Sequence, residues 1–147
     1  MLRLLGIDYG VRRIGTAVAE TETRIAMPDR VLDGRNDVTR DARNVADLGA
    51  AHGVDAFVVG LPLLMDDRES DQTRLTRRFV AELERLSGKP VHLQDERLSS
   101  FAADEVLAEA GRSARRKPGL RDAIAAQKIL QAWLDDPAGQ SHNPPHP

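Results

Sequence analysis

The sequence predicts a mixed α/β fold, in which three antiparallel strands and then two parallel strands form one five-stranded sheet with helices packed on it. Three observations lead to this class. Apolar runs near the start of the chain are joined by short turns, as in antiparallel hairpins. Later apolar runs alternate with helical repeats, and helix crossovers imply parallel strands. The 147 residues are 41% hydrophobic and 30% charged, which is typical of a globular protein.

The first three strands are expected near the N-terminus. Apolar runs at 2–8 and 14–20 form a hairpin, and Gly10 between them allows a tight turn. A third strand at 24–32 contains Pro28. Because proline cannot donate a ladder hydrogen bond, this strand is expected at the edge of the sheet or with a bulge.

Helices and strands alternate over the rest of the chain. Asn36 is a suitable N-cap for a helix whose apolar residues repeat at helical spacing and that ends near Gly53. A short apolar strand at 55–60 then runs into a loop that begins at Leu61. The remaining predicted elements are a helix marked by Leu75 to Leu86, a strand at 91–95, a helix at about 100–110, a basic loop at 111–119 and a helix at 120–134.

The chain is predicted to be one domain over residues 1–135, with a disordered tail at 136–147 that contains four prolines and no apolar period. Cysteine is absent, which excludes disulfides and thiolate metal sites. Arg3 interrupts the opening apolar run, and no run approaches the length of a membrane span, so we expect a cytoplasmic protein without a membrane partner. A monomer and a homodimer through the helix at 74–85 are both compatible with the sequence.

Three separate segments each offer a carboxylate near a strand end or a helix start. Asp8 lies in the first strand, where burying an unpaired charge is costly; alternatively it caps the hairpin turn. Asp122 shares a helical stripe with the apolar residues 4, 7, 8 and 11 positions later, which is the stripe expected to pack on the sheet. The alternative for Asp122 is an ordinary acid in the first turn of a helix.

The third carboxylate comes from the end of the fifth strand, where Asp95, Glu96 and Arg97 follow one another. Alternation with Val91 and Leu93 sends Asp95 to the apolar side, but periodicity is least dependable at a strand end. It therefore does not choose between Asp95 and Glu96. Both acids could instead cap the following helix or pair with Arg97.

Carboxylates that meet at one edge of an α/β sheet predict a divalent metal site. Ligands of open α/β sheets bind at that edge, and neighbouring carboxylates repel one another unless a cation is present. Oxygen ligands without cysteine or a fitting histidine favour Mg²⁺ or Mn²⁺ over zinc. Such a site suits phosphodiester hydrolysis, which then needs no protein nucleophile.

The distribution of basic residues allows a nucleic-acid partner, although the net charge of −2 gives no general attraction to one. Residues 112–121 carry five basic side chains and no acid, and aromatic residues are too few for a base-stacking platform. Binding would therefore be mainly to phosphates; the alternative is a solvated, charged loop. The candidate phosphate-binding residues are Arg12, Arg13, Arg115, Arg116 and Lys117.

Four groups of residues occur together in the order and spacing of one known family. The groups are Gly6-Ile7-Asp8-Tyr9-Gly10 with Arg13-Ile14-Gly15, Val59-Gly60-Leu61-Pro62 with Met65-Asp66, Asp95-Glu96-Arg97-Leu98, and Asp122-Ala123-Ile124-Ala125-Ala126 with Ile129-Leu130. As a set they resemble the YqgF/RuvX family of pre-16S rRNA nucleases and Holliday junction resolvase-like proteins, over residues 2 to about 135.

The resemblance implies a ribonuclease H-like fold and Mg²⁺- or Mn²⁺-dependent nuclease activity. By this resemblance Asp8, Glu96 and Asp122 match the acidic triad that binds metal and is catalytic in the family, which selects Glu96 over Asp95. It also implies nucleic acid as the partner. The substrate would be the 5′ end of the 16S ribosomal RNA precursor, with a branched DNA (a Holliday junction) as the alternative.

Some residues depart from the family pattern without touching the triad. Leu64 stands where Asn is usual, Asp67 and Arg68 replace a Gly-Thr-like turn, and Ala123 follows Asp122 where Ser is common. The first two departures bear on substrate contacts of that loop. An ATPase or sugar-kinase lobe also has a Gly-x-Asp-x-Gly hairpin, but it needs a second lobe for which this chain has no room. A non-catalytic binding module on the same fold is the other alternative, which the intact triad opposes.

Overall fold

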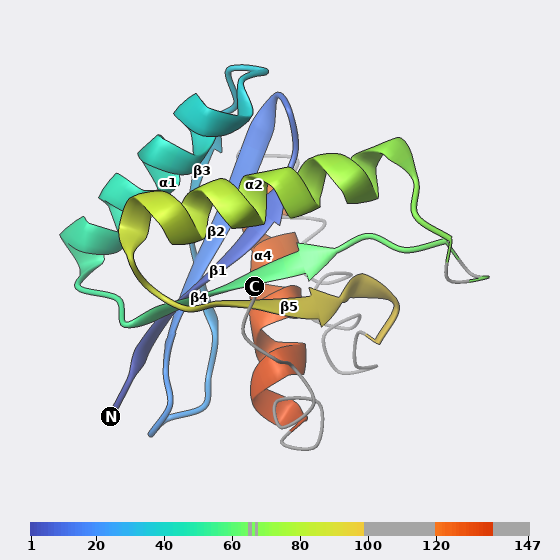
Figure 1. Ribbon diagram of the computed structural model, residues 1–147. Coiled ribbons are helices and arrows are strands. Elements are labelled where there is room, and N and C mark those ends of the chain that lie inside the picture. Colours follow the sequence, from blue (N-terminus) through green and yellow to red (C-terminus); the bar gives the residue numbers. More distant parts are fainter. Residues whose placement is uncertain (65, 67, 99–119, 137–147) are drawn as a thin grey trace.

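The structure is a computed structural model that describes residues 1–64, 66, 68–98 and 120–136 (Figure 1). Its elements are β1 (Arg3–Tyr9), β2 (Arg13–Glu20), β3 (Met27–Asp33), α1 (Val38–His52), β4 (Ala56–Leu61), α2 (Asp71–Ser87), β5 (Val91–Asp95), the 3-10 turn η1 (Glu96–Leu98) and α4 (Leu120–Asp135). The strands form one sheet in the order β3-β2-β1-β4-β5. Strands β1 to β3 pair antiparallel, whereas β4 is parallel to β1 and β5 is parallel to β4. The predicted mixed five-stranded sheet is confirmed.

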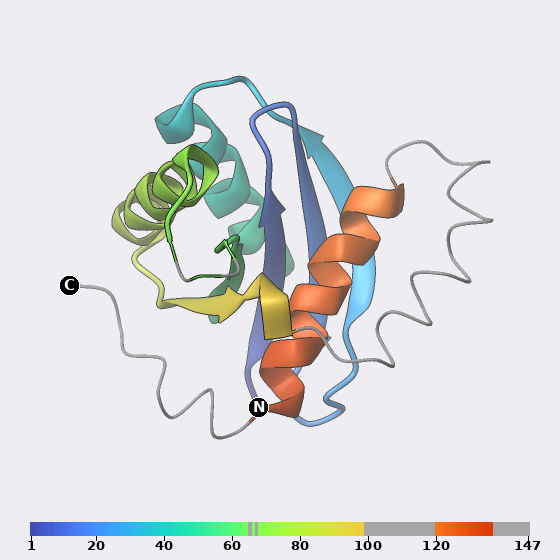
Figure 2. The same cartoon turned by 90° about the vertical axis from the view of Figure 1, so that its right-hand side faces the viewer.

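Helices cover both faces of this sheet. Figure 2 shows α1 and α2 on one side and α4 on the other. The cluster under α1 and α2 includes Phe57 and Phe79, and the cluster under α4 includes Val58 and Leu130, all of them at most 1% exposed. Phe57 and Val58 are consecutive in β4 and point to opposite faces, as strand geometry requires. The sheet thus has a buried core on each side.

Small residues line the face of the sheet that α4 covers. Ala17 and Ala56 belong to this cluster, and Gly6 lies directly beneath the helix. A Cβ atom on Gly6 would lie 2.7 Å from the Cβ of Leu130, closer than real side chains approach. Because there is no side chain at Gly6, α4 can lie close to β1, and the first turn of α4 is thereby brought to the end of the sheet where β1 stops.

The start of α1 corrects the sequence prediction. The N-cap is Asp37, whose Oδ1 accepts a hydrogen bond from the backbone N–H of Arg40 at 3.1 Å. Asn36, the predicted cap, instead has a positive φ of 53°, whereas a cap residue adopts an extended backbone. Spacing alone does not distinguish two adjacent polar residues.

Two strand boundaries also differ from those predicted. Strand β3 begins at Met27 because Arg24 has φ 57° and its N–H bonds back to the carbonyl of Glu20, closing a turn. Leu61 belongs to β4, where it pairs with β5, and not to the following loop. The edge position of Pro28 and the bulge are confirmed: β3 is the outer strand, and its pairing with β2 shifts in register.

The later helices are partly described. Helix α2 begins at Asp71, earlier than its apolar residues show, because Ser70 and Thr73 form a capping box. Helix α4 confirms the predicted final helix. The predicted helix at 100–110, the basic loop at 111–119 and the tail from 137 lie outside the described residues. None of the helices in the described ranges has the length and apolarity needed to cross a membrane.

Candidate active site

Asp8 lies on the α4 face of β1, two positions beyond Gly6 in the alternating pattern of the strand. Its carboxylate makes no hydrogen bond or ion pair within the described ranges. Burial and the nearby charge of Asp122 raise its pKa to about 6. The hairpin turn is closed by the N–H of Gly10 donating to the carbonyl of Arg13 at 3.1 Å, so Asp8 does not cap it.

Glycines stand on both sides of Asp8. Gly15 is its partner across the ladder in β2, and Gly60 follows Val59, the residue of β4 that pairs with Ile7. A Cβ on Gly15 would lie 1.9 Å from the carbonyl oxygen of Asp122, and one on Gly60 would lie 2.7 Å from Oε1 of Glu96. Because Gly15 and Gly60 have no side chains, one acidic residue can approach Asp8 from each neighbouring strand.

Asp122 lies in the first turn of α4, which rests on β2 at Gly15. The stripe predicted to pack on the sheet does so, because the apolar residues that continue it are at most 8% exposed. Asp122 itself is half-buried, and its Oδ2 lies 3.1 Å from Nε of Arg13. The helix therefore brings this carboxylate to Asp8, and the start of β2 supplies an arginine for it.

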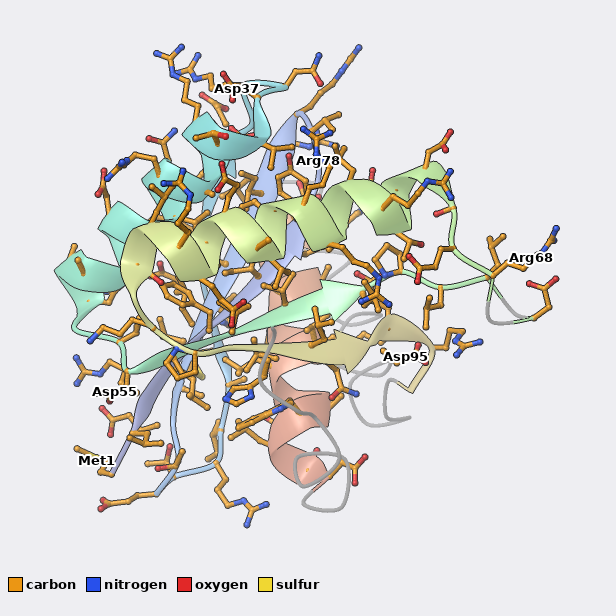
Figure 3. The ribbon with its side chains drawn as sticks, viewed as in Figure 1. Met1, Asp37, Asp55, Arg68, Arg78 and Asp95 are labelled. Carbon is orange, nitrogen blue, oxygen red and sulfur yellow. The ribbon has the colours of Figure 1, made fainter. Side chains whose placement is uncertain are left out.

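Glu96 and Asp95 differ sharply in their surroundings. Asp95 makes a two-pronged ion pair with the guanidinium of Arg97, at 3.0 and 2.7 Å, and its pKa is lowered by that hydrogen bonding. Figure 3 shows Asp95 at the end of β5, where the chain turns. Glu96 begins that turn and folds over Gly60, and burial and then the charge of Asp8 raise its pKa to about 7. The arginine pairing thus applies to Asp95, and Glu96 is the acid that faces Asp8.

Tyr9 fixes the strand end that carries Asp8. Its ring stacks on Phe79 with centroids 4.2 Å apart, and its hydroxyl donates to the fully buried Asp41 at 3.4 Å. The carbonyl of Tyr9 accepts a hydrogen bond from the side chain of Gln72 at 3.1 Å. Burial and the charge of Asp41 raise the pKa of Tyr9 to about 12, so the hydroxyl remains a donor at neutral pH. Asp8 therefore stands on a rigid backbone, which suits a binding site.

Asp8 lies within electrostatic range of both other carboxylates. Charge repulsion from Asp122 acts on Asp8, and repulsion from Asp8 acts on Glu96. A half-buried, unpaired carboxylate between two others has the chemistry of a site for a hard divalent cation, which prefers oxygen ligands. In the described part of the chain, however, no three acidic or histidine side chains form a ready-made metal site. A side chain must turn before three oxygens can meet one ion.

The predicted phosphate-binding residues are only partly described. Arg12 and Arg13 lie at the turn between β1 and β2, beside Asp8, and both are exposed. The predicted Arg115, Arg116 and Lys117 lie outside the described residues.

Two further basic residues were missed from the sequence, one beside the arginine turn and one close to Glu96. Arg35 follows Gly34, whose N–H donates to the carbonyl of Arg12 at 2.7 Å, so the two loops touch. Lys128 of α4 lies close enough to Glu96 for its charge to lower the pKa of that acid against the effect of burial. No local pattern signals Arg35, because a tertiary contact places it. Lys128 is six residues after Asp122 and so misses the helical stripe by one position.

Comparison with known proteins places the chain in a family. Residues 2–136 match the RuvX family, described as "Holliday junction resolvase". A relative from Anaeromyxobacter sp. (strain Fw109-5), named "Putative pre-16S rRNA nuclease", is 47% identical over 137 residues, covering 91% of this chain and 97% of the relative. The chain belongs to the RuvX family. A second relative with the same name, from Maridesulfovibrio salexigens, is 38% identical and covers 90% of this chain and 98% of its own length.

A solved structure supports the fold of this RuvX-family chain. It is "T. thermophilus RuvC in complex with Holliday junction substrate", with a TM-score of 0.62 over 99% of this chain and 100% of that one. The two sequences are 17% identical, so the likeness concerns the fold alone. The predicted ribonuclease H-like fold is confirmed.

Proposed function

We propose that this RuvX-family chain is a divalent-metal-dependent nuclease that hydrolyses phosphodiester bonds, with Asp8, Glu96 and Asp122 as its metal-binding and catalytic residues. One observation carries the proposal. Asp8 is half-buried, has no side-chain partner in the described ranges and lies between two other carboxylates, each of which packs over a glycine. Bound Mg²⁺ or Mn²⁺ would supply an activated water and stabilise charge on the phosphate.

The triad and the residues around it would have separate roles in metal binding, phosphate binding and exclusion of water. Asp8 is central and rigidly held, so it would contact every bound cation, while Glu96 and Asp122 would approach from the two neighbouring strands. Arg12 and Arg13 at the adjacent turn would hold the phosphates on either side of the cleaved bond. The covering helix α4 would exclude water from the sheet side of the site.

The substrate we propose is the precursor of 16S ribosomal RNA, cleaved at its 5′ end. The support is that relatives aligned over nine-tenths of this chain carry the name "Putative pre-16S rRNA nuclease". Branched DNA is the second candidate, because the family is described as a Holliday junction resolvase. A binding module without activity would not need two further acids beside one unpaired carboxylate.

A cleavage assay tests the proposal. The wild-type chain is incubated with end-labelled precursor RNA and, separately, with a four-way DNA junction, in Mg²⁺, in Mn²⁺ or in EDTA. We expect cleavage with either metal, none in EDTA, and faster cleavage of the RNA at the mature 5′ end. Metal-independent cleavage, or binding of both substrates without any cleavage, would contradict the proposal.

A matched pair of neighbouring substitutions tests the choice of Glu96. Glu96→Gln should lower the cleavage rate by about 100-fold or more, because it removes a charged metal ligand. Asp95→Asn should change the rate by less than about threefold, since Asp95 is held by Arg97 and its loss resembles that of a partly exposed ion pair. Single-turnover rates at saturating metal measure both effects. Equal losses in the two variants would show that the wrong acid has been chosen.

Salt dependence tests the role of the arginines at the turn. The affinity of the wild-type chain for nucleic acid in EDTA should fall as salt concentration rises, because phosphate contacts release counterions. Arg12→Gln should reduce the slope of log affinity against log salt by about one. Fluorescence anisotropy with a labelled RNA measures this slope, and Arg85→Gln, at the far end of α2 in an ion pair with Glu82, is the control. A slope that Arg12→Gln leaves unchanged would exclude Arg12 from phosphate binding.

A further inference from the structure

The partner of Asp122 is unexpected for a residue of a cation site. Its Oδ2 is held by Nε of Arg13 at 3.1 Å, across the contact between α4 and the start of β2. Asp8, by contrast, has no such partner in the described ranges. In this arrangement an arginine holds one oxygen of the Asp122 carboxylate. In the described part of the chain, no three acidic side chains form a group that could hold a metal ion.

We propose that Arg13 is an exchangeable partner, which holds Asp122 until a divalent cation binds and then transfers to a phosphate of the nucleic-acid backbone. The inference rests on the proposed function of the site and extends it. It gives Arg13 a role that Arg12, its neighbour in sequence, does not share. Binding of the cation and binding of the nucleic acid would then favour each other through one side chain.

The exposure of the pair makes the exchange feasible. The side chain of Arg13 is 67% exposed and that of Asp122 is 25% exposed. Ion pairs with so much solvent contact are weak, because water competes for both partners. A divalent cation that already has Asp8 and Glu96 as neighbours offers the Asp122 carboxylate a stronger partner. The carboxylate can turn by side-chain rotation while α4 stays on Gly15.

The position of Arg13 also allows it to bind a phosphate after it leaves Asp122. It is the first residue of β2, at the same turn as Arg12, and its side chain has no other partner within the described ranges. Once released, its guanidinium remains beside the carboxylates, where a scissile phosphate would lie. Guanidinium groups bind phosphate oxygens through two parallel hydrogen bonds, which suits this transfer.

The decisive property is the direction of the change in metal affinity. Damage to a metal site weakens metal binding, so a merely structural role for Arg13 predicts weaker binding in Arg13→Gln. If Arg13 instead competes with the cation for Asp122, removing Arg13 predicts tighter metal binding. We expect Arg13→Gln to bind Mn²⁺ about two- to fivefold more tightly than wild type, as a weak ion pair no longer has to break.

Two measurements test the exchange on the full chain without nucleic acid. Isothermal titration gives the Mn²⁺ affinity of wild type, Arg13→Gln and the control Arg12→Gln, which should match wild type. NMR of wild type follows the Nε–H signal of Arg13, assigned by through-bond correlation to the backbone N–H of Arg13. This signal should move when Mg²⁺ is added, because Nε is the atom that contacts Asp122.

The outcomes separate this inference from the function on which it rests. Equal or weaker Mn²⁺ binding by a folded Arg13→Gln, or an Nε–H signal that stays in place at saturating Mg²⁺, would overturn the exchange alone. Absence of Mn²⁺ binding by wild type would overturn the metal site and the exchange together. If Arg13→Gln does not fold, the NMR signal in the wild-type chain decides.

Discussion

Asp8→Asn is expected to lower the cleavage rate by about 1000-fold or more, the largest effect on activity of any substitution in this chain. Asp8 is the central carboxylate, next to both Asp122 and Glu96, so a neutral amide at this position weakens the binding of every cation at the site. The shape of the side chain hardly changes, and Tyr9 still holds the strand end through Gln72. Single-turnover cleavage of the precursor RNA measures the loss. A rate within tenfold of wild type would place the chemistry elsewhere.

The same variant should be more stable than wild type at alkaline pH. The pKa of Asp8 is raised to about 6 in the folded protein from a model-compound value of 3.8, so folding disfavours the charged form. The penalty is absent below the unfolded pKa and appears as pH rises through the folded pKa. Asn carries no charge, so Asp8→Asn should raise the free energy of unfolding by about 2 kcal/mol near about pH 8, with little change near about pH 4.

Urea denaturation at the two pH values, without metal, shows whether Asp8→Asn raises or lowers the free energy of unfolding. A destabilised Asp8→Asn at alkaline pH would mean that Asp8 has a favourable partner in the folded protein. Added Mg²⁺ should stabilise wild type near about pH 8 much more than near about pH 5, because protonated Asp8 and Glu96 do not bind metal. It should have little effect on Asp8→Asn at either pH.

Gly15→Ala is expected to have the largest effect on the architecture of the site. The new Cβ would lie 1.9 Å from the carbonyl oxygen of Asp122 and 2.3 Å from its carbonyl carbon, so α4 must move away from β2. Backbone yields less readily than a flexible side chain, and overpacking of this kind costs about 3 kcal/mol of stability. Displacing Asp122 by about 1 Å should also lower the cleavage rate by about 100-fold.

Gly53→Ala is the matched control for Gly15→Ala. Gly53 caps α1 with φ 67°, and a Cβ there would meet nothing within 4 Å. Its cost, about 1 kcal/mol, comes from the left-handed backbone alone and should leave cleavage unchanged. Thermal unfolding and single-turnover rates, measured well below both melting temperatures, separate loss of stability from loss of the site. Similar behaviour of the two variants would show that α4 does not depend on Gly15.

Much of the fold could be predicted because local patterns and long-range packing agree. The stripe of α4 and the edge position of Pro28 follow from periodicity and from the missing N–H of proline. Two boundary errors follow from backbone conformation: Asn36 and Arg24 have a positive φ, set by hydrogen bonds that residue spacing does not encode. Strand and helix types were therefore more predictable than their ends.

The site was less predictable from the residues, because tertiary contacts decide it. Alternation put Asp95 on the side of Val91 and Leu93 but did not choose between Asp95 and Glu96. In the structure that side packs toward α1 and α2, the strand gives way to a 3-10 turn at Glu96, and Arg97 pairs with Asp95. The family resemblance chose Glu96, whose side chain lies over Gly60, and its role stays a prediction. The contact between Asp122 and Arg13 joins residues more than a hundred positions apart, and no sequence pattern announces it.

A crystal structure of the protein with Mn²⁺ tests the central claim most directly. Data collected at the manganese absorption edge should show an anomalous peak about 2.2 Å from a carboxylate oxygen of Asp8, with Glu96 and Asp122 as further ligands. Arg13 should have left Asp122 in the same crystal. A well-ordered site with no anomalous peak at saturating Mn²⁺, or a peak bound elsewhere with Asp122 still on Arg13, would contradict the account.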